Sequence, residues 1–197
     1  MILDDLRGWM KGEDCVVVGC GPSAHDDALW DLTYAYQTRW LIACNRAVTW
    51  CDPDFAVCVE PRRDKAMWKI INDSSPLIVF SHIDKPHPRA VLIGSKDVQE
   101  WVHPSGPLPE AFSDTPLRLG QSPFYAAAVA ILLGFETIGL IGVDMTKDRY
   151  PNVKGHNAAY ARLAAIGEAM GSRLINLSTA SRLESIPQGT WDEVRTK

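Results

Sequence analysis

The sequence predicts a single α/β domain of the Rossmann-like class, with a doubly wound, mostly parallel sheet and helices on both faces. Short apolar runs rich in Val and Ile alternate with segments of helical periodicity along the 197 residues. The first strong run, at 15–18, leads directly into a glycine-rich turn, which is typical of this class. The links between most runs are short, and short links favour parallel strands joined by helical crossovers.

The N-terminal half is expected to supply four strands and three helices. The strands fall on apolar runs at 15–18, 40–44, 55–59 and 77–80, and the helices on periodic segments at 1–11, 26–36 and 63–72. The stretch 81–120 contains six prolines and is predicted to be an irregular, lid-like excursion with one short strand at 90–93.

Regular elements return in the C-terminal part of the chain. A helix is expected at 122–134, because Ser122 suits the N-cap, Pro123 the first helical position and Gly134 the stop. A strand at 137–143, a helix at 157–171 and a strand at 174–177 follow. No internal repeat interrupts this order, so we treat residues 1–197 as one nucleotide-binding domain.

The composition is that of a soluble globular protein, with 46% hydrophobic and 22% charged residues. The net charge of −4 argues against nucleic acid as a partner. No apolar run approaches the roughly 20 residues needed to cross a bilayer, so we expect no membrane span. The five cysteines lack paired C-x-x-C spacing, so we expect free thiols, no zinc site and a cytoplasmic location.

The turn after the first strand, Gly19-Cys-Gly-Pro-Ser23, is interpreted as a cradle for a nucleotide phosphate. Gly19 and Gly21 let the backbone approach a ligand closely, and Pro22 suits the first position of a helix. The free N–H groups of such a turn, together with the helix dipole, favour an anion. Cys20 lies between the glycines, and Ser23 adds a hydroxyl. An ordinary tight turn without a ligand is the alternative.

Polar residues also follow the other predicted strands, at the edge of the sheet where ligands bind in folds of this class. They are Asn45, Arg46, Glu60, Asp144 and Ser178. We therefore expect one shared nucleotide site along this edge. A nicotinamide dinucleotide site is an alternative, because the turn fits G-x-G-x-x-A. However, the second strand ends in Asn45 rather than in the acidic residue that holds the ribose in that fold.

Several segments, in matching order, resemble the bacterial sialyltransferases of glycosyltransferase family 42. They also resemble the related family of 6-hydroxymethylpterin diphosphokinases and flagellin-modifying motility accessory factors. The segments are 19–23, 44–46, 122–144, 155–156 and 176–183. The resemblance covers most of the chain outside 60–120 and implies a sialyltransferase-like form of the Rossmann-like fold.

The sialyltransferase branch implies a metal-independent, inverting transfer from a CMP-sugar or similar donor, with no cofactor required. By this resemblance, the turn 19–23 would hold the phosphate and ribose, and Asn45 would bond the nucleotide. Ser122 would face the donor from a helix N-terminus, and Asp144 would hold the ribose or cytosine side.

The same branch implies a catalytic pair. His156 would be the general base that takes the proton of the acceptor hydroxyl, and Tyr150 would hydrogen-bond the departing phosphate. Thr146 stands where the family has its first phosphate-binding tyrosine, and Cys20 stands where it has an asparagine. The acceptor, the donor sugar and the formation of a homo-oligomer are left open.

The diphosphokinase branch implies instead ATP and Mg²⁺, with Asp144 and Glu60 as candidate carboxylate ligands. This chain ends its second strand in Cys44-Asn45-Arg46, where the resemblance would place an aspartate-containing motif. A nucleotide-binding module without catalytic activity is the third alternative.

Overall fold

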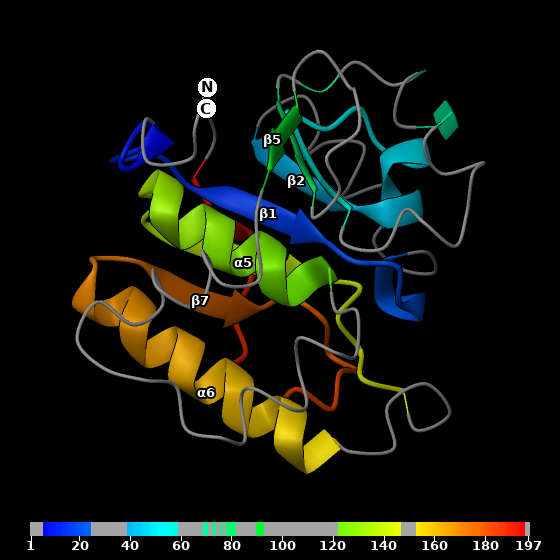
Figure 1. Cartoon of the computed structure of the whole chain (residues 1–197). Coiled ribbons are helices and arrows are strands. Elements are labelled where there is room, and N and C mark those ends of the chain that lie inside the picture. The colour runs from blue at the N-terminus through cyan, green and yellow to red at the C-terminus, as the bar shows by residue number, and fades with distance from the viewer. Residues whose placement is uncertain are drawn as a thin grey trace.

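The computed structural model describes residues 6–24, 39–58, 69–70, 73, 76, 78–81, 90–92, 122–146 and 153–195. Within them, a seven-stranded sheet has the order β5-β4-β3-β2-β1-β6-β7, and every neighbouring pair is parallel (Figure 1). The strands are β1 Cys15–Val18, β2 Trp40–Cys44, β3 Phe55–Cys58, β4 Ile78–Ser81, β5 Ala90–Leu92, β6 Thr137–Ile141 and β7 Arg173–Asn176. The predicted α/β Rossmann-like class is confirmed.

The sheet is wound in two directions from β1. From β1 the chain adds β2 to β5 on one side, and it then returns to add β6 and β7 on the other side. Val17 in β1 consequently pairs with Ile42 of β2 and with Leu140 of β6. The strand order reverses between β1 and β6, and in open parallel sheets the ligand crevice lies beyond the carboxyl ends of the strands at such a reversal.

One face of the sheet is covered by two α-helices, α5 Ser122–Leu133 and α6 Val153–Ala169. In Figure 1, α5 (green) runs alongside β1, and α6 (yellow to orange) runs beside β7. All residues of α5 except Pro123 are buried, which explains why its sequence has no polar face. Neither helix, nor any other helix in the described ranges, is long and apolar enough to cross a membrane.

The opposite face carries a second hydrophobic cluster that contains Val16, Val18 and Leu41. Three short 3-10 helices accompany it among the described residues: η2 Pro22–Ala24, η3 Asn45–Thr49 and η5 Trp191–Glu193. After β1 the chain passes to this face, where Ala24 is buried, whereas after β6 it passes to the α5 and α6 face. The chain therefore leaves β1 and β6 toward opposite faces of the sheet.

Three predicted boundaries are corrected by local geometry. β6 ends at Ile141 rather than at 143, because Gly142 turns the chain with a φ of 71°. α6 begins at Val153 rather than at 157, so His156 lies inside its first turn. Residues 6–12 form turns instead of helix, because Gly8 and Gly12 adopt φ values of 72° and 90°.

Five further predicted elements lie within the described residues and agree with the structure. The strands at 15–18 and 40–44 are confirmed, the strands near 77–80 and 90–93 are confirmed within one residue, and the helix at 122–134 ends at Leu133 as expected. The predicted helix 26–36, most of 63–72 and most of the excursion 81–120 lie outside the described residues.

The buried carboxylate of Asp14 joins the two ends of the described chain at the amino edge of the sheet. It accepts hydrogen bonds from the backbone N–H of Thr137 at 2.9 Å and from that of Arg195 at 2.8 Å. The Arg195 guanidinium adds an ion pair at 2.9 Å. Burial opposes the charged form of Asp14, but the hydrogen bonds outweigh it and hold the pKa of this carboxyl below its ordinary value. This ion pair lies at the edge opposite to the candidate site.

Candidate functional site

The glycine-rich turn after β1 packs directly against the loop after β6. The backbone N–H of Gly21 donates to the carbonyl of Gly142 at 2.8 Å, and the N–H of Gly142 donates to Ser23 Oγ at 3.0 Å. A Cβ on Gly19 would overlap the carbonyl oxygen of Gly142, and a Cβ on Gly21 would lie 2.6 Å from the same oxygen. Both glycines are therefore required by the approach of two backbones, independently of any ligand.

Asp144 connects three loops at the carboxyl edge of the sheet. Its buried carboxylate accepts a hydrogen bond from the backbone N–H of Ser23 at 2.8 Å on Oδ2 and one from the hydroxyl of Ser178 at 2.7 Å on Oδ1. Its carbonyl oxygen accepts from the N–H of Arg182 at 3.0 Å. The Ser23 N–H, one of the turn's groups predicted to be free for a phosphate, therefore donates to a carboxylate of the protein itself.

A second connection at this edge joins β2 to the start of α5. The hydroxyl of Ser122 donates to Oδ1 of Asn45 at 3.1 Å, directly after the end of β2. Asn45 has a φ of 50°, a left-handed conformation that Asn tolerates better than most residues. Its Nδ2 group makes no hydrogen bond to the described residues, so this half-exposed amide keeps an available donor.

Cys20 joins the glycine turn to the end of β2, because its thiol donates to the carbonyl of Cys44 at 3.2 Å. All five cysteines are free, as predicted. Cys20 is half-buried, whereas the other four are buried. Burial raises the pKa of Cys51 to about 12 and places that of Cys44 well above its ordinary range.

His156 is deeply buried, with 1% of its surface exposed. Burial disfavours the charged imidazolium and lowers the pKa of His156 below its ordinary value, so the ring is neutral at pH 7. A neutral imidazole is the form that a general base requires. An acceptor hydroxyl reaches this ring only when neighbouring groups move aside, and its role as base stays a prediction.

The described site residues separate into an accessible set and a buried set. The accessible set is Cys20, Gly21, Pro22, Ser23, Asn45, Arg46 and Thr146, and the buried set is Gly19, Ser122, Asp144, His156 and Ser178. Hydrogen bonds connect the turn after β1 with the end of β2 and with Asp144 after β6, and Asp144 is bonded in turn to Ser178 after β7. Tyr150 and Glu60 lie outside the described residues.

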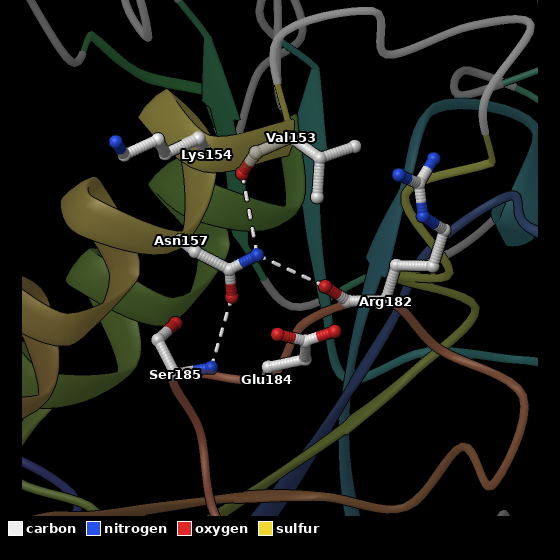
Figure 2. Close-up of a pocket in the computed structure, with 6 residues that line it drawn as sticks. All are labelled: Val153, Lys154, Asn157, Arg182, Glu184 and Ser185. Atoms are coloured by element: carbon white, nitrogen blue, oxygen red, sulfur yellow. Dashed lines mark hydrogen bonds between the residues drawn. The ribbon is translucent and has the colours of Figure 1, made fainter.

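An open pocket of about 500 Å³ lies beside this edge and was not predicted from the sequence. Figure 2 shows its lining residues, which come from the first turn of α6 and from the segment after β7. They are Val153, Lys154, Asn157, Arg182, Glu184 and Ser185. Residues 182–185 lie in the segment after β7. The expectation that polar residues after strand ends form the site would therefore also have indicated this segment.

The fold is that of known glycosyltransferases. The MAf glycosyltransferase from Magnetospirillum magneticum AMB-1 superposes with a TM-score of 0.60 and 16% identity over 99% of this chain, which spans 38% of that protein. The sialyltransferase CstII from Campylobacter jejuni, in complex with the substrate analogue CMP-3FNeuAc, gives a TM-score of 0.57 with 15% identity, covering 93% of this chain and 88% of CstII.

A second CstII structure, in complex with cytidine-5'-monophosphate, gives a TM-score of 0.57 with 14% identity over 90% of this chain and 85% of CstII. No protein-family model matches the sequence, and no curated protein matches it. At these identities the likeness concerns the fold. The chain has the Rossmann-like fold of the sialyltransferase CstII and the MAf glycosyltransferase.

Proposed function

We propose that this protein is a nucleotide-binding transferase of the glycosyltransferase type, which uses a CMP-sugar or a similar donor at the carboxyl edge of β1 and β6. The observation that carries the proposal is the pair of hydrogen bonds by which Asp144 joins the loops after β1, β6 and β7. These loops meet where the strand order reverses, which is the usual ligand site of this fold class. The CMP ligands of CstII support the choice of nucleotide.

The accessible groups at this edge suit a nucleotide. The Nδ2 group of Asn45 supplies a donor for a carbonyl oxygen of the base or an oxygen of the ribose. The hydroxyl of Ser23 accepts from Gly142 and keeps its own proton for a phosphate oxygen. Arg46 is exposed and adds positive charge at the same edge, and Thr146 adds a second half-exposed hydroxyl. In this assignment Asp144 positions the turn rather than contacting the nucleotide.

The proposed chemistry is an inverting transfer. The acceptor oxygen forms a bond to the anomeric carbon while the bond from that carbon to the phosphate oxygen breaks, and the nucleotide leaves with the bonding electrons. His156 takes the proton of the acceptor hydroxyl, and its lowered pKa keeps it unprotonated beforehand. Tyr150 is proposed to hydrogen-bond the leaving phosphate, which would replace the charge neutralisation of a metal.

A nucleotide-binding module without catalytic activity is the second candidate, and the burial of His156 favours it. The third candidate is a diphosphokinase that uses ATP and Mg²⁺. The described residues fit that ion only in part, because each carboxylate oxygen of Asp144 already accepts one hydrogen bond. Its proposed partner ligand, Glu60, lies outside the described residues.

Calorimetric titration with CMP, ATP and NAD, each with and without Mg²⁺, tests these candidates. CMP binding without Mg²⁺ supports the first two, and ATP binding only with Mg²⁺ supports the third. Asn45→Asp keeps the shape and the left-handed tolerance of the residue but removes the Nδ2 donor and adds a negative charge. We expect it to weaken CMP binding at least about tenfold, since hydrogen bonds to charged or polar ligand atoms are worth about 1.5 kcal/mol or more.

Met170→Glu is the matched control, because it adds the same charge to an exposed position after the far end of α6. Equal CMP affinity in Asn45→Asp and in the control would reject the assigned edge. If His156→Gln abolishes turnover of a CMP-sugar but retains CMP affinity, the result supports the transferase over the binding module. Absence of binding for every nucleotide would reject the proposed function.

A further inference from the structure

The pocket between the first turn of α6 and the segment after β7 is a second candidate binding site. Its volume of about 500 Å³ lies within the range of ligand pockets, about 300–1,000 Å³. It shares no lining residue with the proposed nucleotide site, but the two sites are joined by one hydrogen bond. The backbone N–H of Arg182 in the pocket wall donates to the carbonyl of Asp144 at 3.0 Å.

The framework of the pocket is held by the side chain of Asn157. Its Nδ2 group donates to the carbonyl oxygens of Val153 at 3.2 Å and Arg182 at 2.9 Å, and its Oδ1 accepts from the N–H of Ser185 at 2.8 Å. Figure 2 shows this amide between the helix and the opposite wall. Because both the Nδ2 and the Oδ1 of Asn157 form hydrogen bonds to the protein, the two walls of the pocket are fixed relative to each other.

The charges that line the pocket are not paired with other described side chains. Neither the Lys154 ammonium nor the Arg182 guanidinium forms an ion pair within the described ranges, and the first turn of α6 contains no acidic residue. In Figure 2 these two side chains lie on opposite sides of Asn157. Glu184 is the one carboxylate among the described lining residues, so the lining carries two cations and one anion.

The polar groups of the pocket suit hydroxyls as well as an anion. A carboxylate such as that of Glu184 accepts hydrogen bonds from sugar hydroxyls. Within the described residues, the buried Ser185 Oγ has no hydrogen-bond partner, and a buried polar atom without a partner is uncommon. A ligand that carries both hydroxyls and a negative group would complement this combination.

We propose that this pocket binds the anionic group of the acceptor, and that the acceptor is a sugar acid or a sugar phosphate. The Arg182 guanidinium forms the two parallel hydrogen bonds that planar oxyanions accept, and Lys154, on the other side of Asn157, adds positive charge to the pocket without contacting the same group. Glu184 and Ser185 receive the sugar hydroxyls. The proposal rests on the glycosyltransferase function above, because only a transferase needs an acceptor beside its donor site.

Binding of glucuronate, glucose 6-phosphate and glucose to the full chain, measured by ligand-observed NMR titration, tests the proposal. We expect the two anionic sugars to bind at least about tenfold more tightly than glucose, which lacks the group that Arg182 binds. Lys154→Gln with Arg182→Gln should remove this preference. Lys11→Gln with Lys69→Gln is the control for loss of two exposed positive charges, and it should leave the preference intact.

Ser185→Ala separates a ligand contact from a structural role. The substitution removes a buried hydroxyl without a partner, so the thermal midpoint should stay equal or rise while the affinity for glucuronate falls. Equal binding of glucose and glucuronate, unchanged affinity in the double variant, or no binding of any probe would overturn the proposal. CMP titration of the same samples distinguishes failure of this proposal from failure of the proposed glycosyltransferase function, because the double variant leaves the nucleotide edge intact and should still bind CMP.

Discussion

The carboxylate of Asp144 accepts a 2.8 Å hydrogen bond from the backbone N–H of Ser23, although 121 residues separate them in the chain. The bond joins the glycine turn after β1 to the loop after β6, at the point where the strand order reverses. With the second hydrogen bond from Ser178, a single buried side chain therefore holds three segments of the proposed nucleotide edge.

Asp144→Asn is expected to lower the free energy of unfolding by about 1–3 kcal/mol, since an amide accepts on only one of its two ends and leaves one buried donor unpaired. Urea unfolding followed by circular dichroism measures this difference. Asp192→Asn, at an exposed position, is the control and should change the free energy by no more than about 0.5 kcal/mol. Equal losses in both variants would show that Asp144 does not hold these loops.

Gly21→Ala should be destabilising for steric reasons. The added Cβ would overlap Asp144 Oδ2 and lie 2.6 Å from the carbonyl oxygen of Gly142, and neither neighbour can move without breaking the loop contact. We expect a loss of about 2–3 kcal/mol in the free energy of unfolding, with CMP affinity reduced in parallel.

Gly171→Ala is the matched control for that substitution. Gly171 has a φ of 87° but no atom within 4 Å of an added Cβ, so its cost comes from backbone conformation alone, about 1 kcal/mol. If Gly21→Ala costs no more than Gly171→Ala, the close approach of the two backbones is not a constraint on the turn.

The burial of His156 should appear in the pH dependence of stability. Because burial lowers the pKa of the folded imidazole, the unfolded state, with a pKa near 6.5, binds the proton first as the pH falls. The contribution of this ring to the free energy of unfolding is therefore complete above about pH 6.5. It is lost as the pH falls below that value, by at most about 1.4 kcal/mol per pH unit. His156→Gln should flatten the curve between pH 7.5 and 5.

The control for this prediction is Ser172→Ala. It removes a buried hydrogen bond of 2.6 Å to the carbonyl of Phe135 and lowers stability without changing any titrating group. Its pH curve should run parallel to that of the unmodified protein. A His156→Gln curve that also runs parallel would mean that the ring is accessible to protons in the folded state.

The sheet could be predicted from the sequence because each strand is a local signal. Runs such as Cys15–Val18 are apolar on both faces and end at glycine or polar residues, and the observed strands start and end within a few residues of those runs. The collection of Asn45, Asp144 and Ser178 at one edge followed from parallel strands alone.

The contacts made at that edge could not be predicted in the same way. The side chain of Asn157, inside α6, bonds to Arg182 and Ser185, which are distant from it in the sequence. The role of Asp144 as the partner of Ser23 likewise depends on a contact between separate loops. No local pattern distinguishes a carboxylate that binds a ligand from one that binds the protein.

The thiol of Cys20 provides a direct probe of where a nucleotide binds. Cys20 lies half-buried inside the glycine turn, whereas Cys51 is buried and burial raises its pKa to about 12. At pH 8, iodoacetamide should therefore modify Cys20 first, because the thiolate is the reactive form and must also be reached by the reagent. Mass spectrometry of the digested protein identifies the modified residue.

Saturating CMP should slow this modification at least about tenfold if the nucleotide occupies the turn, since the bound fraction is shielded and reaction proceeds through the free fraction. Cys20→Ser, which keeps a small polar side chain, should remove the fast reaction and leave CMP affinity within about twofold. Modification of Cys20 at an unchanged rate in CMP-saturated protein would place the nucleotide away from the turn, even where calorimetry detects binding. The glycines would then serve only the contact between the loops after β1 and β6.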